Sequence, residues 1–128
     1  MPRLSRNRSL IAALTLLALA AASTVSAAAG PSAQASRSCG VGSGRHLGPT
    51  YVLQLSVSRT SCRNGKKLIR AYNACRRRNG GRKGRCGGTL GYKCSERRFN
   101  KSSQSFDAKV KCSKSGGRRI NHTYTQFT

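Results

Sequence analysis

Residues 51–78 read YVLQLSVSRTSCRNGKKLIRAYNACRRR, and this stretch decides the fold. Its first part alternates Tyr51, Leu53, Leu55 and Val57 with shorter or more polar residues, which predicts a strand over 51–58 with one buried face. From residue 62 to residue 78 the spacing becomes helical, with an apolar side for the core and a basic side opposite. The apolar side comprises Cys62, Gly65, Ile69, Tyr72 and Cys75, flanked by Leu68, and the basic side Arg63, Lys67, Arg70 and Arg77.

Clear boundary signals surround the predicted helix. Thr60 or Ser61 can cap its first turn, and the sequence Asn79-Gly80-Gly81 ends it. Three further alternating runs follow, separated by a polar loop at 101–104 and a glycine turn at 115–117. These runs are Leu90, Tyr92 and Cys94, then Phe106, Ala108, Val110 and Cys112, then Ile120, His122 and Tyr124. The order predicts an α+β fold, β-α-β-β-β, with one helix packed on a small mixed sheet.

The N-terminal part has the composition of an export signal. Three arginines precede an uncharged run over 10–22, which is too short to span a bilayer comfortably, and small residues follow over 23–30. We therefore expect residues 1–29 to be a signal peptide that is removed. Residues 30–50 are rich in Gly, Ser and Pro and are predicted to be a flexible leader, which leaves residues 51–128 as the folded domain. An uncleaved N-terminal anchor is the alternative for the first segment.

Charge and cysteine content together limit how the exported chain can be held together. The sequence has 25 Lys and Arg against two acids, and losing Arg3, Arg6 and Arg8 with the signal lowers the formal charge from +23 to +20. Few large apolar side chains remain to offset that repulsion and the entropy of folding. All six cysteines follow the predicted signal, so disulfides are expected to stabilise the domain, each by about 2–4 kcal/mol. The cysteine spacings contain no zinc motif, and neither a metal nor a cofactor is expected.

The predicted element directions favour one set of disulfides. If the chain runs up the first strand, down the helix and up the next strand, the expected pairs are Cys62–Cys94, Cys39–Cys112 and Cys75–Cys86. The main alternative joins Cys94 to Cys112 across a hairpin and Cys39 to Cys62.

Residues 51–124 resemble a family of small exported actinobacterial proteins. The resemblance rests on Val57 followed by Cys62 at the helix start, Gly91-Tyr92-Lys93-Cys94, and Val110-Lys111-Cys112 before a basic glycine turn and Ile120. The segment from Cys75 to Cys86 is an addition to that outline. The resemblance implies export and an α+β disulfide fold, and it implies no activity and no site residues.

The densest basic segment lies at residues 76–85. If Cys75 pairs with Cys86, this segment becomes a closed cationic loop whose arginines can pair with phosphate or carboxylate and whose glycines let backbone N–H groups approach an anion. The predicted polyanion-binding residues are Arg76, Arg77, Arg78, Arg82, Lys83 and Arg85. The alternative is a solvated turn that only aids solubility.

These features favour a secreted, non-enzymatic cationic protein, retained at the cell wall or elsewhere by an anionic polymer such as wall polymer, nucleic acid or anionic lipid. An exported inhibitor or protein-binding module is one alternative. A small ribonuclease-like hydrolase is another, for which the sequence offers His46, His122, Glu96 and Asp107 as acid–base groups. His122 shares a predicted strand face with Ile120 and Tyr124, a position that favours a structural role.

Overall fold

The computed structural model describes residues 35–128, which form one sheet and one long helix. The predicted signal peptide, the alternative anchor and the start of the leader lie outside the described residues. The strands are β1 (Arg37–Ser38), β2 (Tyr51–Ser58), β3 (Gly88–Thr89), β4 (Tyr92–Phe99), β5 (Ser105–Lys114) and β6 (Arg118–Phe127). The helix α1 spans Cys62–Arg78, and short 3-10 turns lie at η1 (Arg45–Leu47) and η2 (Gly81–Lys83). No helix within residues 35–128 is long and apolar enough to cross a membrane.

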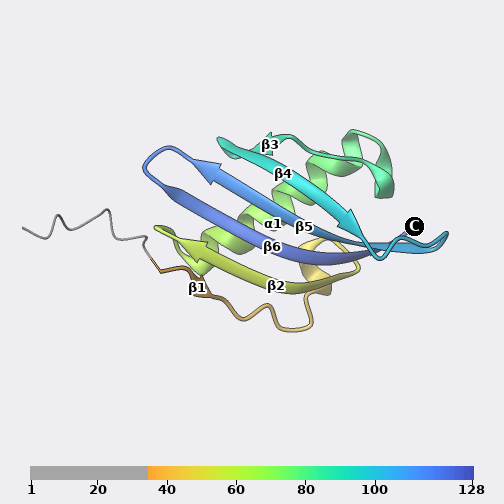
Figure 1. The fold of residues 1–128 in the computed structure, drawn as a ribbon, viewed down its shortest axis with the longest axis horizontal. Coiled ribbons are helices and arrows are strands. Elements are labelled where there is room, and N and C mark those ends of the chain that lie inside the picture. Colours follow the sequence, from red (N-terminus) through yellow and green to blue (C-terminus); the bar gives the residue numbers. More distant parts are fainter. Residues whose placement is uncertain (1–34) are drawn as a thin grey trace, which may run out of the picture. The chain divides into compact units, whose positions relative to one another are not determined.

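The sheet is larger than predicted and entirely antiparallel. Its strand order is β1-β2-β6-β5-β4-β3, so the C-terminal strand lies beside β2 near the middle of the sheet (Figure 1). The α+β class with one helix on a sheet is confirmed. The mixed sheet and the simple β-α-β-β-β order are wrong, because β1 and β3 are additional strands and no pair is parallel.

A tight turn at Leu90–Gly91 explains the error in strand direction. The sequence pattern treats residues 90–94 as one strand, whereas Leu90 and Gly91 both have positive φ (52° and 76°) and join β3 to β4 as a hairpin. The chain reverses once more than expected, so β4 runs antiparallel to β2. The sequence gives no indication of a positive φ at Leu90, since β-branched and bulky apolar residues rarely adopt this conformation.

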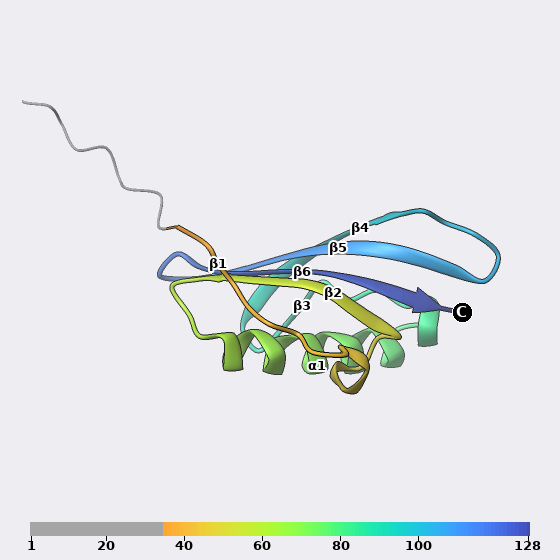
Figure 2. The ribbon, with the colours of Figure 1, turned by 90° about the horizontal axis from the view of Figure 1, so that it is seen from below.

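The helix covers one face of the sheet, as Figure 2 shows from the side. Ser61 caps its start by accepting a hydrogen bond from the Asn64 N–H at 3.2 Å. The predicted apolar side faces the core, where Leu68 and Ile69 are fully buried. A Cβ built on Gly65 would lie 3.0–3.1 Å from Val57 and Leu55, so glycine at this position lets α1 approach β2 closely.

A bulge in β2 changes which of its residues face the core. The pairing with β6 shifts between Val52 and Gln54, which leaves Leu53 as the extra residue and 51 % exposed. Val52, rather than Leu53, is therefore buried beside Leu55 and Val57. A bulge adds one residue to a strand and inverts the alternation on one side of itself.

The leader predicted over 30–50 is ordered from β1 onward. Its residues Arg37 and Ser38 pair with Val57 and Ser56 at the far end of β2, and the chain then runs back along the domain before entering that strand. Leu47 in η1 is fully buried in the core. The glycines that predicted a flexible segment instead provide turns at positive φ, such as Gly44 and Gly48.

The six cysteines all form disulfides: Cys39–Cys62, Cys75–Cys86 and Cys94–Cys112. The prediction of Cys75–Cys86 is confirmed. Cys62–Cys94 and Cys39–Cys112 are wrong, and the alternative pairing is the observed one. Cys39 follows β1 and so lies near the end of β2 and the helix start, while Cys94 and Cys112 are direct cross-strand partners with Cα atoms 4.1 Å apart.

Candidate functional site

The basic segment 76–85 is only partly a surface feature. Arg76 is 1 % exposed, so its assignment as a polyanion-binding residue is wrong. Its Nη2 donates to the Arg82 carbonyl at 2.6 Å and its Nε to the Gly84 carbonyl at 3.1 Å. The segment therefore wraps around the Arg76 guanidinium and turns carbonyl groups inward, which is the opposite of presenting N–H groups to an external anion.

The other predicted residues of the segment remain accessible to different degrees. Arg77, Arg78, Arg82 and Lys83 are exposed. Arg85, with 58 % of its side chain exposed, donates to the Glu96 carbonyl at 3.2 Å and lies 3.7 Å from the Glu96 carboxylate. Arg98 of β4 also binds the segment, through the carbonyls of Lys83 (2.9 Å) and Gly84 (2.7 Å). The segment is thus a structural cap over buried charges, with five cations on its outside.

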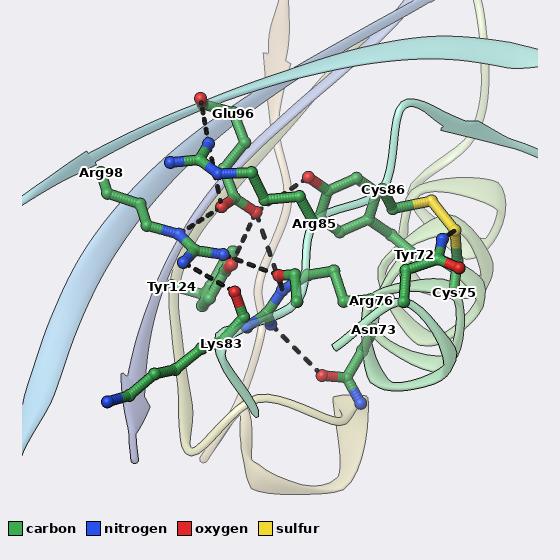
Figure 3. A network of polar contacts seen from close by, with 12 residues as sticks. Tyr72, Asn73, Cys75, Arg76, Lys83, Arg85, Cys86, Glu96, Arg98 and Tyr124 are labelled. Atoms are coloured by element: carbon green, nitrogen blue, oxygen red, sulfur yellow. Dashed lines mark hydrogen bonds and ion pairs between the residues drawn. A yellow bond between two sulfur atoms is a disulfide. The ribbon is translucent and has the colours of Figure 1, made fainter. Parts of the chain in front are cut away.

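Those buried charges form a cluster of Glu96, Tyr72, Tyr124, Arg76 and Arg98, which we call the Glu96 cluster (Figure 3). The Glu96 side chain is 2 % exposed and accepts hydrogen bonds from both tyrosine hydroxyls at 2.8 Å and from Arg98 Nε at 2.6 Å. Arg76 Nε lies 3.7 Å from the same carboxylate, and its guanidinium stacks 4.6 Å from the Tyr124 ring centre.

The cluster keeps Glu96 ionised despite its burial. Desolvation alone would raise the pKa of Glu96, but the hydrogen bonds from Tyr124, Tyr72 and Arg98 outweigh it and hold that pKa below its usual value. Burial, together with the neighbouring carboxylate, raises the pKa of Tyr72 and Tyr124, so both remain protonated donors. This is the chemistry of a satisfied internal ion pair.

The residues offered for acid–base catalysis do not converge on an accessible site. His46 is exposed in η1, while His122 is 2 % exposed and packs between Tyr72 and Tyr124. Burial lowers the pKa of His122 to about 4, so the ring is neutral near pH 7. Asp107 lies near the start of β5 on the sheet face opposite the helix, where it accepts hydrogen bonds from Thr125 Oγ1 at 2.6 Å and Asn100 Nδ2 at 2.8 Å. A substrate cannot reach His122 or Glu96 in this arrangement.

The opposite face of the sheet, which we call the outer face, has no covering element within residues 35–128 (Figure 2). Residues that alternate with the core positions of β4, β5 and β6 point to it. Its cations are Lys93, Arg97, Lys109, Lys111 and Arg119. Small polar residues lie among them, namely Gln54, Ser56, Ser58, Ser95, Ser113, Asn121 and Thr123.

The strand register arranges these residues in rows across the sheet. Arg97 is directly opposite Lys109, which is opposite Thr123. In another row Ser113 lies between Lys93 and Arg119. Between these rows Lys111 is flanked by Ser95 on one side and Asn121 on the other. The outer face is therefore a basic surface with hydroxyl and amide groups between the charges.

Two shallow hollows mark this surface. One, of about 500 Å³, is lined by three cations with small polar residues between them. Its lining comprises Lys93, Lys111, Arg119, Ser95, Ser113 and Asn121, together with Cys94 and Cys112. The second, of about 240 Å³, lies beside it and includes Lys109, Lys111 and Thr123.

The outer-face cations have no internal role. Within residues 35–128, the side chains of Lys93, Arg97, Lys109, Lys111 and Arg119 make no hydrogen bond and no ion pair, in contrast to those of Arg76, Arg85 and Arg98. Sequence reasoning missed this surface because it followed the buried positions of each strand. The signal was present in the intervening positions, which in residues 93–97, 109–113 and 119–123 are basic, hydroxyl or amide residues throughout.

The described residues contain no group of three His, Cys, Asp or Glu side chains able to hold a metal ion. No family model, no curated protein and no solved structure matches the chain.

Proposed function

We propose that this is a secreted, non-enzymatic cationic protein that associates with anionic polymers through the outer face of its sheet. The observation that carries the proposal is the register of like charges on that face. Arg97 and Lys109 are directly opposite on neighbouring strands, a placement that destabilises a sheet when no anion compensates it.

The acidic residues of the chain do not supply that compensation. The sequence has only two, and Glu96 is buried on the helix side of the sheet against Arg76 and Arg98. Asp107 lies on the outer face two residues before Lys109, but its carboxylate accepts hydrogen bonds from Asn100 and Thr125 and forms no ion pair within residues 35–128. An external polyanion would supply the missing negative charge, and releasing its counterions would favour binding.

The predicted export signal and the three disulfides support an extracellular setting, where wall polymers, polysaccharides and released nucleic acids are the abundant anions. Of the predicted loop residues, Arg77, Arg78, Arg82, Lys83 and Arg85 remain on the surface and would add to long-range attraction. Long-range attraction of a polyanion depends on the summed charge of the protein. Direct binding depends on the face whose cationic side chains are already positioned, which is the outer face.

The test compares two charge-reversal variants of equal net charge. Lys109→Glu with Lys111→Glu changes the outer face, and Arg63→Glu with Lys67→Glu changes the exposed side of α1. Binding of each protein to heparin is measured by calorimetry over a range of NaCl concentrations, after circular dichroism has shown that both are folded.

We expect the outer-face variant to bind heparin about tenfold more weakly and with a shallower dependence on salt, because it has lost specific contacts as well as charge. The helix variant should bind heparin more weakly only by the amount that follows from its lower net charge. Equal losses in both variants would mean that total charge, rather than this face, governs binding.

A further inference from the structure

The larger hollow on the outer face has the composition of a site for a single oxyanion. Ser113 lies on the middle strand of its lining, with Lys93 and Arg119 directly across on the two neighbouring strands and Lys111 two residues earlier on the same strand. Directly opposed side chains have Cβ atoms roughly 4.5–5.5 Å apart, and alternate residues on a strand lie about 7 Å apart. Three long cationic side chains can therefore reach one point above the Ser113 hydroxyl.

From this array we infer that the protein binds a phosphoryl group above Ser113, held by Lys93, Lys111 and Arg119. The inference rests on the proposed function and specifies it, because it names the group of the polymer that is recognised and the place where it binds. Ser95 and Asn121 border the same hollow and offer a hydroxyl and an amide to the remaining oxygen atoms.

The number and kind of donors favour phosphate. A tetrahedral phosphoryl group presents several oxygens in different directions, and an arginine fork with two lysine ammonium groups and a hydroxyl can bind them at the same time. The exposed side of α1 also carries cations, including Arg63, Lys67 and Arg70. Lys67 borders a hollow of about 290 Å³, but that hollow also contains Leu90 and Tyr92, and its other cations, Lys114 and Arg118, donate to backbone carbonyls. Charge density alone therefore does not distinguish the outer face; the grouping around Ser113 does.

The same surface lacks the means to recognise bases. The rows that contain the cations carry no aromatic side chain, and the nearest ones, Tyr51, Phe99 and Phe127, lie at the edge beside Asp107 and Thr125. Tyr51 is also occupied, because Arg45 hydrogen-bonds its hydroxyl and lies over its ring. Proteins that bind single-stranded nucleic acids rely on bases stacking against aromatic rings. The polymer that fits is a phosphodiester chain without bases, such as a polyol phosphate.

The first experiment titrates the folded protein with inorganic phosphate and follows backbone amide shifts by NMR at constant ionic strength, with sodium chloride as the balancing salt. Saturable shifts should be confined to the neighbourhood of Lys93, Ser113 and Arg119. Shifts spread evenly over the outer face and α1 would overturn the inference.

Two variants with matched charge locate the site. Lys111→Gln should weaken phosphate binding about tenfold, since it removes a charge-assisted hydrogen bond. Lys109→Gln removes the same charge from the same strand outside the larger hollow, and should weaken it about twofold or less. Ser113→Ala, which leaves the charge unchanged, should weaken it severalfold. Equal effects of the two lysine variants would refute the site.

The two proposals fail in different ways. If heparin binding depends on the outer face but phosphate does not localise at Ser113, the proposed function stands and the phosphate site is wrong. If the heparin comparison gives equal losses while phosphate does localise, the site stands without the polymer role.

A polymer comparison then identifies the source of the phosphate. Poly(glycerol phosphate) should bind at least as tightly as an oligothymidylate with the same number of phosphates. About tenfold tighter binding of the oligothymidylate would instead assign the site to nucleic acid, and binding of free phosphate alone would exclude both polymers.

Discussion

At the scale of single residues, the notable feature is that the chain buries one of its two acids. Glu96 is the anion for Arg76 and Arg98 and the acceptor for two tyrosine hydroxyls, so several polar groups of the core depend on one carboxylate. In a protein this basic, the position of a single negative charge decides which arginine can be buried.

Replacing Glu96 should therefore be costly. Glu96→Gln leaves the buried Arg76 guanidinium without its anion, and we expect the free energy of unfolding at pH 7 to fall by about 3–5 kcal/mol. Urea denaturation followed by circular dichroism measures this. Asp107→Asn is the matched control: it makes the same change in charge at a less buried position, and a loss of about 1 kcal/mol or less is expected there. Similar losses in both variants would contradict the role of the Glu96 cluster.

His122 predicts a dependence of stability on pH. Both ring nitrogens are buried without a hydrogen-bond partner, and the pKa of His122 falls from 6.5 to about 4 on folding. The charged groups that face it are Glu96 and Arg76, beside the rings of Tyr72 and Tyr124. Between pH 6.5 and 4 the unfolded chain binds the extra proton, so stability should fall as the pH is lowered through this window, by about 3 kcal/mol in all.

The variant His122→Leu should remove most of that dependence. At pH 7 its stability should be within about 1 kcal/mol of the parent, because it replaces a neutral, unpaired polar ring by an apolar side chain. Denaturation midpoints measured at pH 7 and pH 4.5 for both proteins provide the check. An unchanged pH dependence in the variant would show that other groups cause it.

At the scale of elements, the connection from α1 to β3 is shaped by its backbone. Gly84 is buried, and both Arg76 and Arg98 donate to its carbonyl. A Cβ at this position would lie 2.0 Å from the Arg76 carbonyl oxygen. The basic segment is thus held against the helix end by close backbone contact as well as by the Cys75–Cys86 disulfide.

Gly84→Ala should consequently displace the segment. We expect a loss of about 1–3 kcal/mol in the free energy of unfolding, typical of an added group where no space exists. Gly87→Ala is the control, because a Cβ there meets nothing within 4 Å and its φ is not positive. Its effect should stay within about 0.5 kcal/mol. The midpoints of thermal denaturation of the two variants distinguish these expectations. Equal midpoints would show that the segment can move to accommodate the added Cβ at little cost in stability.

At the scale of the whole molecule, the two faces of the sheet differ in the side chains that they carry. The helix side holds the apolar core and the neutralised charges, and the outer face carries cations that form no ion pair within the described chain. Two of the disulfides bind the ends of α1, to the segment after β1 and to the segment before β3, and the third joins β4 to β5.

Reduction should accordingly unfold the domain. Three bridges at about 2–4 kcal/mol each together match the whole stability of a typical small domain, about 5–15 kcal/mol. After complete reduction at neutral pH and low salt, we expect the dispersion of amide signals in the NMR spectrum to be lost. A reduced protein with native dispersion would show that the core alone suffices.

The sequence by itself determined the elements whose signals are local: the helix over 62–78, a cap at Thr60 or Ser61, the buried positions of β5 and β6, and the link from Cys75 to Cys86. Only the tertiary structure decided the direction of β4, the other two disulfides, the burial of Arg76 and the row of cations on the outer face. The physical reason is that periodicity reports how a residue relates to its neighbours along the chain. A reversal at Leu90, a carbonyl that turns toward Arg76 and a lysine opposite an arginine each depend on segments that meet only after folding.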